Sequence, residues 1–159
     1  MTVLPYNYTL AYENSKNGTP LMRPLFFEEP QNTALYNNAS TYLWGNHFLV
    51  TPIVKPGVIL KEMYFPKDAV WFDFYSDEKV VGGQTKKVEV VPDYIPTYVK
   101  AGAFIPMAKP MQTTSEYQGK FVELHYYHDA SVTKSSGKMY NDNGLDANAI
   151  ANGNYEVLH

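Results

Sequence analysis

The 159-residue sequence contains no cysteine, which excludes disulfide frameworks, cysteine-ligated zinc and a thiol nucleophile. No apolar run reaches the roughly 18 residues that a membrane-spanning helix needs. The chain also has no excess of positive charge. Its net charge of −3 gives no basic surface for phosphates, so a nucleic-acid partner is not expected. The compartment stays open, because a chain without cysteine suits the cytoplasm and an exported location equally.

What the sequence does have is apolar and aromatic side chains, at 45% and 15% of its residues, with 18% charged. A disordered chain needs low apolar content and high net charge, so this composition predicts a folded chain.

One segment near the start predicts an α-helix. Residues 4–12 carry apolar side chains three and four positions apart, as one face of a helix does. Pro5 suits the first turn, where its missing N–H costs nothing, and Asn17-Gly18 supplies the end. Tyr6 and Leu10 add a second apolar stripe, so the helix requires packing partners on two sides.

After the helix the sequence alternates between strand-like stretches and turns. Residues 87–90 and 122–126 alternate between apolar and polar side chains, as half-buried strands do. Stretches rich in β-branched and aromatic residues predict further strands at 21–27, 47–54, 59–65, 70–75, 97–105 and 155–158. Turn-forming pairs separate them, among them Pro56-Gly57, Gly82-Gly83, Asn143-Gly144 and Asn152-Gly153. This pattern predicts a mainly β chain in which an antiparallel β-sandwich follows one α-helix. The strands after residue 108 are too few for an independent sheet, which predicts a partial second β domain.

Glu28 and Glu29 are adjacent carboxylates, the residue type that carries glycoside hydrolysis. Catalytic carboxylates must face each other across a sugar at about 5–9.5 Å. Neighbours on an extended strand point to opposite faces, so we interpret this pair as a solvated strand end.

Two further clusters hold metal-ligating residue types. His125 and His128, three positions apart, would stand on opposite faces of a strand and could not bind one ion. We interpret His128 and Asp129 as a turn at the strand end, and the cluster as structural. Asp142 and Asp146 faintly resemble a calcium loop, but the regular oxygen ligands and the terminal bidentate glutamate are lacking. A hairpin turn at Asn143-Gly144 accounts for the same residues without a calcium ion.

The tryptophans leave two functions open. Trp44 and Trp71, with nearby tyrosines, could fill a sandwich core or stack on sugar rings. The second reading would make the chain a stand-alone carbohydrate-binding β-sandwich module.

Several blocks of the sequence carry a family resemblance. Leu-Pro-Tyr-Asn-Tyr at 4–8 is followed by Gly-Thr-Pro-Leu-Met-Arg-Pro-Leu-Phe at 18–26. Further blocks lie at 42–54, 63–66 with 70–74, 95–106, and 140–144 with 153–155. In this order they resemble the C-terminal region of glycoside hydrolase family 31, which contains α-glucosidases and α-xylosidases. The family's acidic pair before Gly144 is reduced here to Asp142 between two asparagines.

The resemblance implies a retaining α-glycosidase of carbohydrate metabolism as the parent protein. One carboxylate attacks the anomeric carbon, and the other protonates the leaving oxygen and then activates water. In the family these are two aspartates on barrel strands upstream of the Leu-Pro-Tyr helix, and neither motif occurs here. We therefore expect no catalytic residue, no cofactor-binding residue and no metal ligand in this chain, and no hydrolytic activity of the chain alone.

The resemblance also implies a division of the chain: residues 1–17 as the last helix of a truncated catalytic barrel, 18–108 as the proximal C-terminal β-sandwich, and 109–159 as a linker with an incomplete distal β domain. The expected partners are the missing barrel of the same polypeptide and the oligosaccharide bound by the parent. An exposed apolar helix face and an unpaired terminal strand predict self-association of the isolated chain.

Overall fold

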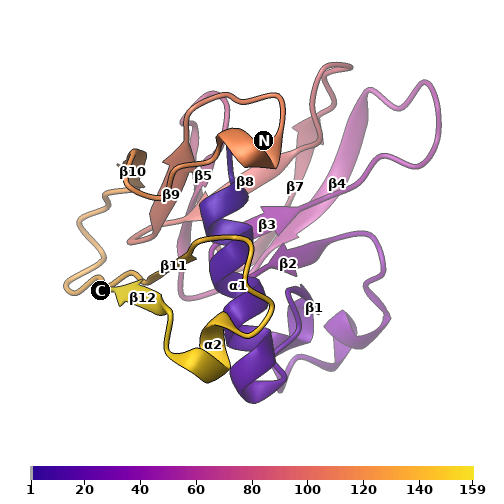
Figure 1. Ribbon diagram of the computed structural model, residues 1–159. Coiled ribbons are helices and arrows are strands. Elements are labelled where there is room, and N and C mark those ends of the chain that lie inside the picture. Colours follow the sequence, from indigo (N-terminus) through magenta and orange to yellow (C-terminus); the bar gives the residue numbers. More distant parts are fainter. Residues whose placement is uncertain (1) are drawn as a thin grey trace. The chain divides into compact units, whose positions relative to one another are not determined.

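The computed structural model describes residues 2–159, which group into two compact units (Figure 1). The helical unit holds the residues up to Leu21, Gly102–Tyr126 and Thr133–His159. The sandwich unit holds Met22–Ala101 and Tyr127–Val132. Within residues 2–159, no helix has the length and apolar character to cross a membrane.

The sandwich unit is built on a six-stranded antiparallel sheet in the order β1–β2–β3–β8–β5–β6. Its strands are β1 (Met22–Pro24), β2 (Tyr42–Trp44), β3 (Phe48–Val50), β8 (Thr97–Lys100), β5 (Val70–Asp73) and β6 (Lys79–Val81). β4 (Leu60–Phe65) and β7 (Gln84–Glu89) form a separate antiparallel ribbon. Two short 3-10 helices, η1 (Leu25–Phe27) and η2 (Thr33–Asn37), follow β1.

The sheet and the ribbon share one apolar core. The register places Leu49 of β3 opposite Tyr98 of β8, so both side chains leave the same face of the sheet. Phe65 of the ribbon meets the Tyr98 ring edge-on, with centroids 4.8 Å apart. The buried cluster that these residues belong to also contains Leu25, Leu35, Leu43, Met63, Trp71, Val80 and Val88. Burial of each large side chain here contributes about 1.5–3 kcal/mol to the stability of the fold. The predicted antiparallel sandwich is confirmed.

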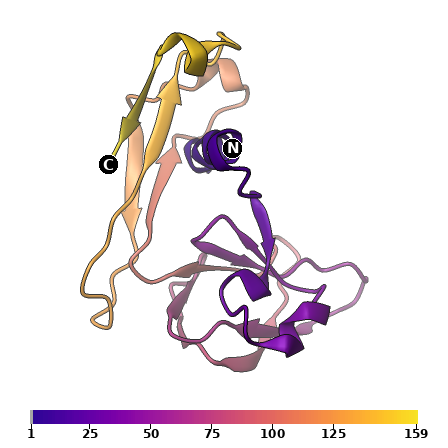
Figure 2. The same ribbon diagram turned by 90° about the horizontal axis from the view of Figure 1, so that it is seen from below.

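The helical unit consists of one long helix and two antiparallel strand pairs. The helix α1 (Leu4–Asn17) contacts β9 (Phe104–Ala108) and β11 (Met139–Asp142), and Figure 2 shows it end-on beside these strands. β9 pairs with β10 (Val122–Tyr126), and β11 pairs with β12 (Tyr155–Leu158). The short helices η3 (Thr114–Glu116) and α2 (Ala149–Asn152) lie in the loops.

The predicted helix and its end are confirmed. Gly18 takes the left-handed conformation, with φ of 73°, and its N–H donates to Asn14 O at 2.8 Å. The prediction of an exposed apolar face on this helix is wrong. Tyr6 and Leu10 are only 5% and 4% exposed, and Tyr12 of the other stripe stacks on Tyr140 of β11. The chain itself therefore buries the Tyr6 and Leu10 stripe, while the stripe of Leu4, Tyr8 and Tyr12 is half-buried.

Several strand predictions need correction. The stretch 97–105 is two strands rather than one, because Gly102 turns the chain at a φ of 82° between β8 and β9. Asn143-Gly144 does not close a two-residue hairpin: residues 143–154, including α2, separate β11 from β12. The alternation at 122–126 is present, but Leu124 and Tyr126 are 60% and 41% exposed, so β10 is not half-buried.

Candidate functional site

Glu29 lies just after η1 and is 4% exposed. Its carboxylate accepts hydrogen bonds from the Tyr64 hydroxyl at 2.9 Å, the Lys67 backbone N–H at 2.7 Å and Asn32 Nδ2 at 2.9 Å. The interpretation of the acidic pair as a solvated strand end is therefore wrong for Glu29. These contacts tie the loop after η1 to the end of β4.

The hydrogen bonds decide the charge of this carboxylate. Burial by itself would raise the pKa of Glu29, but the donors from Asn32, Lys67 and Tyr64 favour the ionised form and lower the pKa below its ordinary value. Burial and the hydrogen bond to Glu29 raise the pKa of the Tyr64 hydroxyl to about 12. A glycosidase acid needs a raised pKa so that it holds a proton near neutral pH, and Glu29 has the opposite perturbation.

Glu28 has helical backbone angles, φ −84° and ψ −34°. The two neighbouring glutamates therefore do not alternate across a strand, and both line a cavity of about 550 Å³ beside Tyr64 and Lys67. Glu28 forms an ion pair with Lys100 at 2.6 Å. Both acids at this cavity are thus paired with donors.

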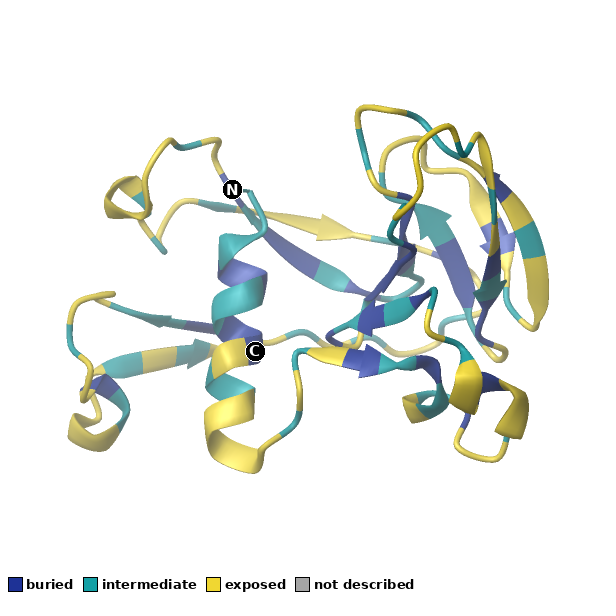
Figure 3. Ribbon diagram, turned by 90° about the vertical axis from the view of Figure 1, so that its right-hand side faces the viewer, coloured by how far each residue is buried: buried dark blue, intermediate teal, exposed yellow. Residues whose placement is uncertain are grey.

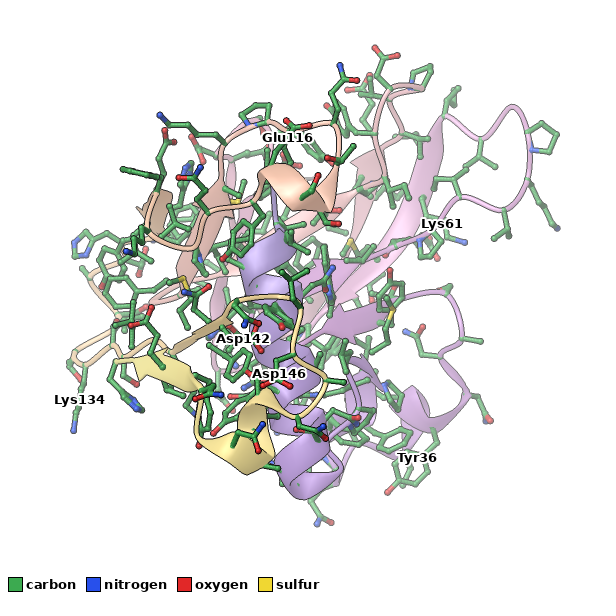
Figure 4. The ribbon with its side chains drawn as sticks, viewed as in Figure 1. Tyr36, Lys61, Glu116, Lys134, Asp142 and Asp146 are labelled. Atoms are coloured by element: carbon green, nitrogen blue, oxygen red, sulfur yellow. The ribbon has the colours of Figure 1, made fainter. Side chains whose placement is uncertain are left out.

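A half-buried carboxylate of the helical unit also accepts several hydrogen bonds. Asp142 accepts the Tyr8 hydroxyl at 2.5 Å, the Tyr140 hydroxyl at 2.6 Å and the Gly144 N–H at 2.7 Å. Tyr8 comes from α1 and Tyr140 from β11, so the carboxylate links the helix to the strand; Figure 4 shows Asp142 beside the helix. The two tyrosine rings meet edge-on with centroids 5.1 Å apart. We call these four residues the Asp142 cluster.

The cluster keeps Asp142 ionised and its tyrosines neutral. Burial opposes the charge, but the hydrogen bonds from Tyr140, Tyr8 and Gly144 outweigh it and lower the pKa of Asp142. Burial and the bond to Asp142 raise the pKa of Tyr8 to about 12, and the pKa of Tyr140 is raised by the same causes.

The remaining acidic candidates have local partners. Asp146 accepts the Asn148 N–H at 2.8 Å, which lowers its pKa. Asp129 is 8% exposed and forms an ion pair with Lys79. That contact, with the hydrogen bonds from Ser131, holds the pKa of Asp129 well below its usual range.

The histidine cluster shows no metal-site geometry. His125 Nε2 lies 3.7 Å from Glu123 Oε2 on the exposed side of β10. Among residues 2–159, no three histidine, aspartate or glutamate side chains converge as a metal site would require.

The tryptophans differ in their availability to a sugar. Trp71 is fully buried, and its indole N–H donates to Pro66 O at 3.2 Å. The hypothesis that Trp71 stacks on a ligand is therefore wrong. Trp44 is half-buried and stacks on Phe48 with centroids 5.1 Å apart.

Comparison with known proteins decides the family. The family description "Glycosyl hydrolase family 31 C-terminal domain" matches residues 18–105. This chain belongs to glycosyl hydrolase family 31. An α-xylosidase of Saccharolobus solfataricus is 31% identical over 143 residues, covering 90% of this chain and 19% of the relative. A family 31 glucosidase of Schizosaccharomyces pombe is 38% identical over 149 residues, covering 91% of this chain and 15% of the relative.

A solved structure supports the same assignment. The family 31 dextranase of Flavobacterium johnsoniae, a mutant in complex with isomaltotriose, is 30% identical with a TM-score of 0.86. The match covers 95% of this chain and 19% of the dextranase. The chain thus spans less than a fifth of the length of these relatives.

The sequence analysis predicted neither the hydrogen bonds of Glu29 nor those of Asp142. Their donors lie far from the acids along the chain: Tyr64 is 35 positions from Glu29, and Tyr8 is 134 positions from Asp142. The sequence does show acidic residues next to apolar strand residues. An acid in such a place needs hydrogen-bond donors when it is buried, but the sequence does not show which residues supply them.

Proposed function

We propose that this chain is the non-catalytic C-terminal β portion of a retaining α-glycosidase, and that it supports the catalytic barrel of that enzyme. The observation that carries the proposal is the family match over residues 18–105, together with relatives of which the chain spans only 15–19%. Those relatives are named as an α-xylosidase and a glucosidase, so the parent would act on α-glycosides.

The chemistry of the acidic side chains supports a non-catalytic role. A retaining enzyme needs one ionised carboxylate and one protonated carboxyl about 5–5.5 Å apart. Glu29 and Asp142 both have lowered pKa values and partners within the fold. They stabilise loops and strands, and neither is prepared to give a proton to a leaving group.

The proposed domain boundaries follow from the family resemblance. Residues 1–17 would be the last helix of the barrel region, 18–108 the proximal sandwich, and 109–159 part of a distal β domain. The partner would be the barrel of the same polypeptide, which would bind the oligosaccharide substrate.

Two assays test the absence of catalysis and of sugar binding. The purified chain should not hydrolyse aryl α-glucosides or aryl α-xylosides. Turnover that is lost in Asp73→Asn, Asp129→Asn or Asp142→Asn would overturn the proposal, whereas turnover that survives all three would identify a contaminating enzyme. Titration with maltose or isomaltose should leave tryptophan fluorescence unchanged; saturable quenching would favour the carbohydrate-binding alternative.

A chimera tests the supporting role. This chain would replace the matching region of the Flavobacterium dextranase, which is 30% identical to it. A soluble chimera that hydrolyses the host's own substrate is expected. A chimera that acquires a new substrate preference would contradict a purely supporting role.

A further inference from the structure

Residues 127–132, which connect β10 to β11, group with the sandwich unit rather than with the two strands that they join. We call these six residues the strap. Figure 3 shows that the loops are mostly exposed or half-buried, yet Asp129 in the middle of the strap is only 8% exposed. A carboxylate that is buried to this extent needs a partner.

The strap contacts one cross-strand pair of the six-stranded sheet. Phe72 of β5 stands opposite Lys79 of β6, so both side chains leave the same face of the sheet. Their chain neighbours Trp71 and Val80 belong to the buried core cluster. Successive side chains on a strand point to opposite faces, so Phe72 and Lys79 lie on the face that is turned away from that core.

Two side chains of the strap bind this pair. The ring of Tyr127 lies beside that of Phe72 with centroids 6.1 Å apart, and Asp129 forms an ion pair with Lys79. The Asp129 carboxylate also accepts the Ser131 N–H at 3.0 Å and the Ser131 hydroxyl at 2.7 Å. An aromatic ring thus meets an aromatic ring and an acid meets a base, which gives the strap one defined position on β5 and β6.

The attachment depends on side chains. Within residues 2–159 the strap belongs to no sheet, so no strand ladder fixes its main chain. The Lys79 side chain is 50% exposed, so ions in the solvent can screen its charge. Segments with few buried contacts open locally at a lower free energy than core strands do.

We propose that the strap is a salt-sensitive conformational switch. The ion pair between Asp129 and Lys79 holds it on β5 and β6, and loss of that pair releases it while the sheet stays folded. Release exposes the pair of Phe72 and Lys79 and leaves the connection between β10 and β11 free to move. The sheet itself does not respond in this way, because its core cluster is apolar.

The first test is limited proteolysis of the full chain by chymotrypsin, with fragments identified by mass. Cleavage after Tyr127 requires an open strap, because the docked ring packs beside Phe72. Asp129→Asn should speed this cleavage by about tenfold, since it removes a hydrogen-bonded ion pair. Lys79→Met should do the same, and Lys79→Arg, which keeps the charge, should stay near the wild-type rate.

Glu78→Gln is the matched control. It removes one negative charge next to Lys79 in the chain, as Asp129→Asn does in space, but the Glu78 carboxylate binds Lys86 at 2.8 Å. Its cleavage rate after Tyr127 should equal that of the wild type. An unchanged rate in Asp129→Asn, or equal acceleration in both variants, would overturn the proposal.

The second test varies the ionic strength. Raising sodium chloride from about 0.01 M to about 1 M shortens the Debye length from about 30 Å to about 3 Å. The wild-type rate should rise toward that of Asp129→Asn, and the rate of the variant should stay constant. Both rates are corrected with a free peptide of residues 122–132. The same salt dependence in both proteins would exclude an electrostatic switch.

The third test separates release of the strap from unfolding of the sandwich unit. Release exposes little surface, so wild-type cleavage after Tyr127 should be nearly independent of urea below the transition that tryptophan fluorescence follows. A cleavage rate that rises in proportion to the unfolded fraction would show that cleavage needs global unfolding, which contradicts a local switch.

Discussion

Removing the Tyr8 hydroxyl tests the Asp142 cluster, because Tyr8→Phe deletes one donor and keeps the ring that meets Tyr140 edge-on. A hydrogen bond to a charged group contributes about 1.5–3 kcal/mol net. The carboxylate keeps two donors in the variant, from Tyr140 and Gly144, and water can reach the partly buried site. We therefore expect a loss near the lower bound, about 1.5 kcal/mol of unfolding free energy.

The loss should depend on pH with a definite sign. The pKa of Asp142 is lower in the folded chain than its ordinary value of 3.8, so the unfolded chain binds more protons between these two values. The stabilisation is present above pH 3.8 and is lost as the pH falls through the folded value. The difference between wild type and Tyr8→Phe should therefore shrink in acid.

The distribution of chromophores allows each unit to be monitored. Trp44 and Trp71 both lie in the sandwich unit, whereas α1 and α2 lie in the helical unit. Tryptophan fluorescence then reports unfolding of the sandwich unit, and helical circular dichroism reports the helical unit. In urea titrations, Tyr8→Phe should lower the midpoint of the dichroism transition.

Two further variants, one expected to have a smaller effect on stability and one a larger effect, are compared with Tyr8→Phe. Tyr36→Phe removes an exposed hydroxyl that donates to Pro30 O, and should change stability by less than about 0.5 kcal/mol. Asp142→Asn should cost more than Tyr8→Phe, because an amide nitrogen would face one of the tyrosine hydroxyls. A Tyr8→Phe loss as small as that of Tyr36→Phe, or one independent of pH in acid, would refute the reasoning.

Three further substitutions test the sandwich unit by urea unfolding followed with fluorescence or, where the tryptophan itself is changed, with dichroism. Glu29→Gln should destabilise by about 2–3 kcal/mol, because an amide cannot accept from all the donors that the carboxylate satisfies; a neutral result would show that water replaces them. Trp71→Phe should cost about 2–4 kcal/mol through the lost bond to Pro66 and the cavity left in the core, and a loss below 1 kcal/mol would indicate repacking. Gly82→Ala should prevent folding of the unit, since the added Cβ would stand 2.0 Å from Pro66 O. The control Gly57→Ala, in the same unit, meets no atom within 4 Å and should cost only about 1–2 kcal/mol of backbone strain; equal effects of the two alanines would contradict the steric reason.

Local chemistry in the sequence was sufficient for the elements whose signals are short-range. The helix from Leu4 to Asn17 follows from its apolar spacing and from Gly18, which supplies the left-handed end. The alternation in β7 correctly places Val88 inside and its charged neighbours outside. The ordered blocks that resemble family 31 were equally readable, because they consist of contiguous residues.

Elements with weak local signals became visible only in the fold. β2 and β6 are each three residues long, too short to display a period of two. Leu124 alternates as a buried strand residue would, yet it is 60% exposed. Alternation tells which side chains share a face of a strand, but it carries no information on whether another element covers that face.

The sequence by itself determined the helix, most of the strands and the family. Only the tertiary structure decided how far each acid is withdrawn from water and which groups bind it: Glu29 is buried and binds Tyr64, and the half-buried Asp142 binds Tyr8 and Tyr140. The reason is that the charge state of a buried acid depends on donors brought from distant parts of the chain. Such donors are neighbours in space and not in sequence, so no local sequence pattern predicts them.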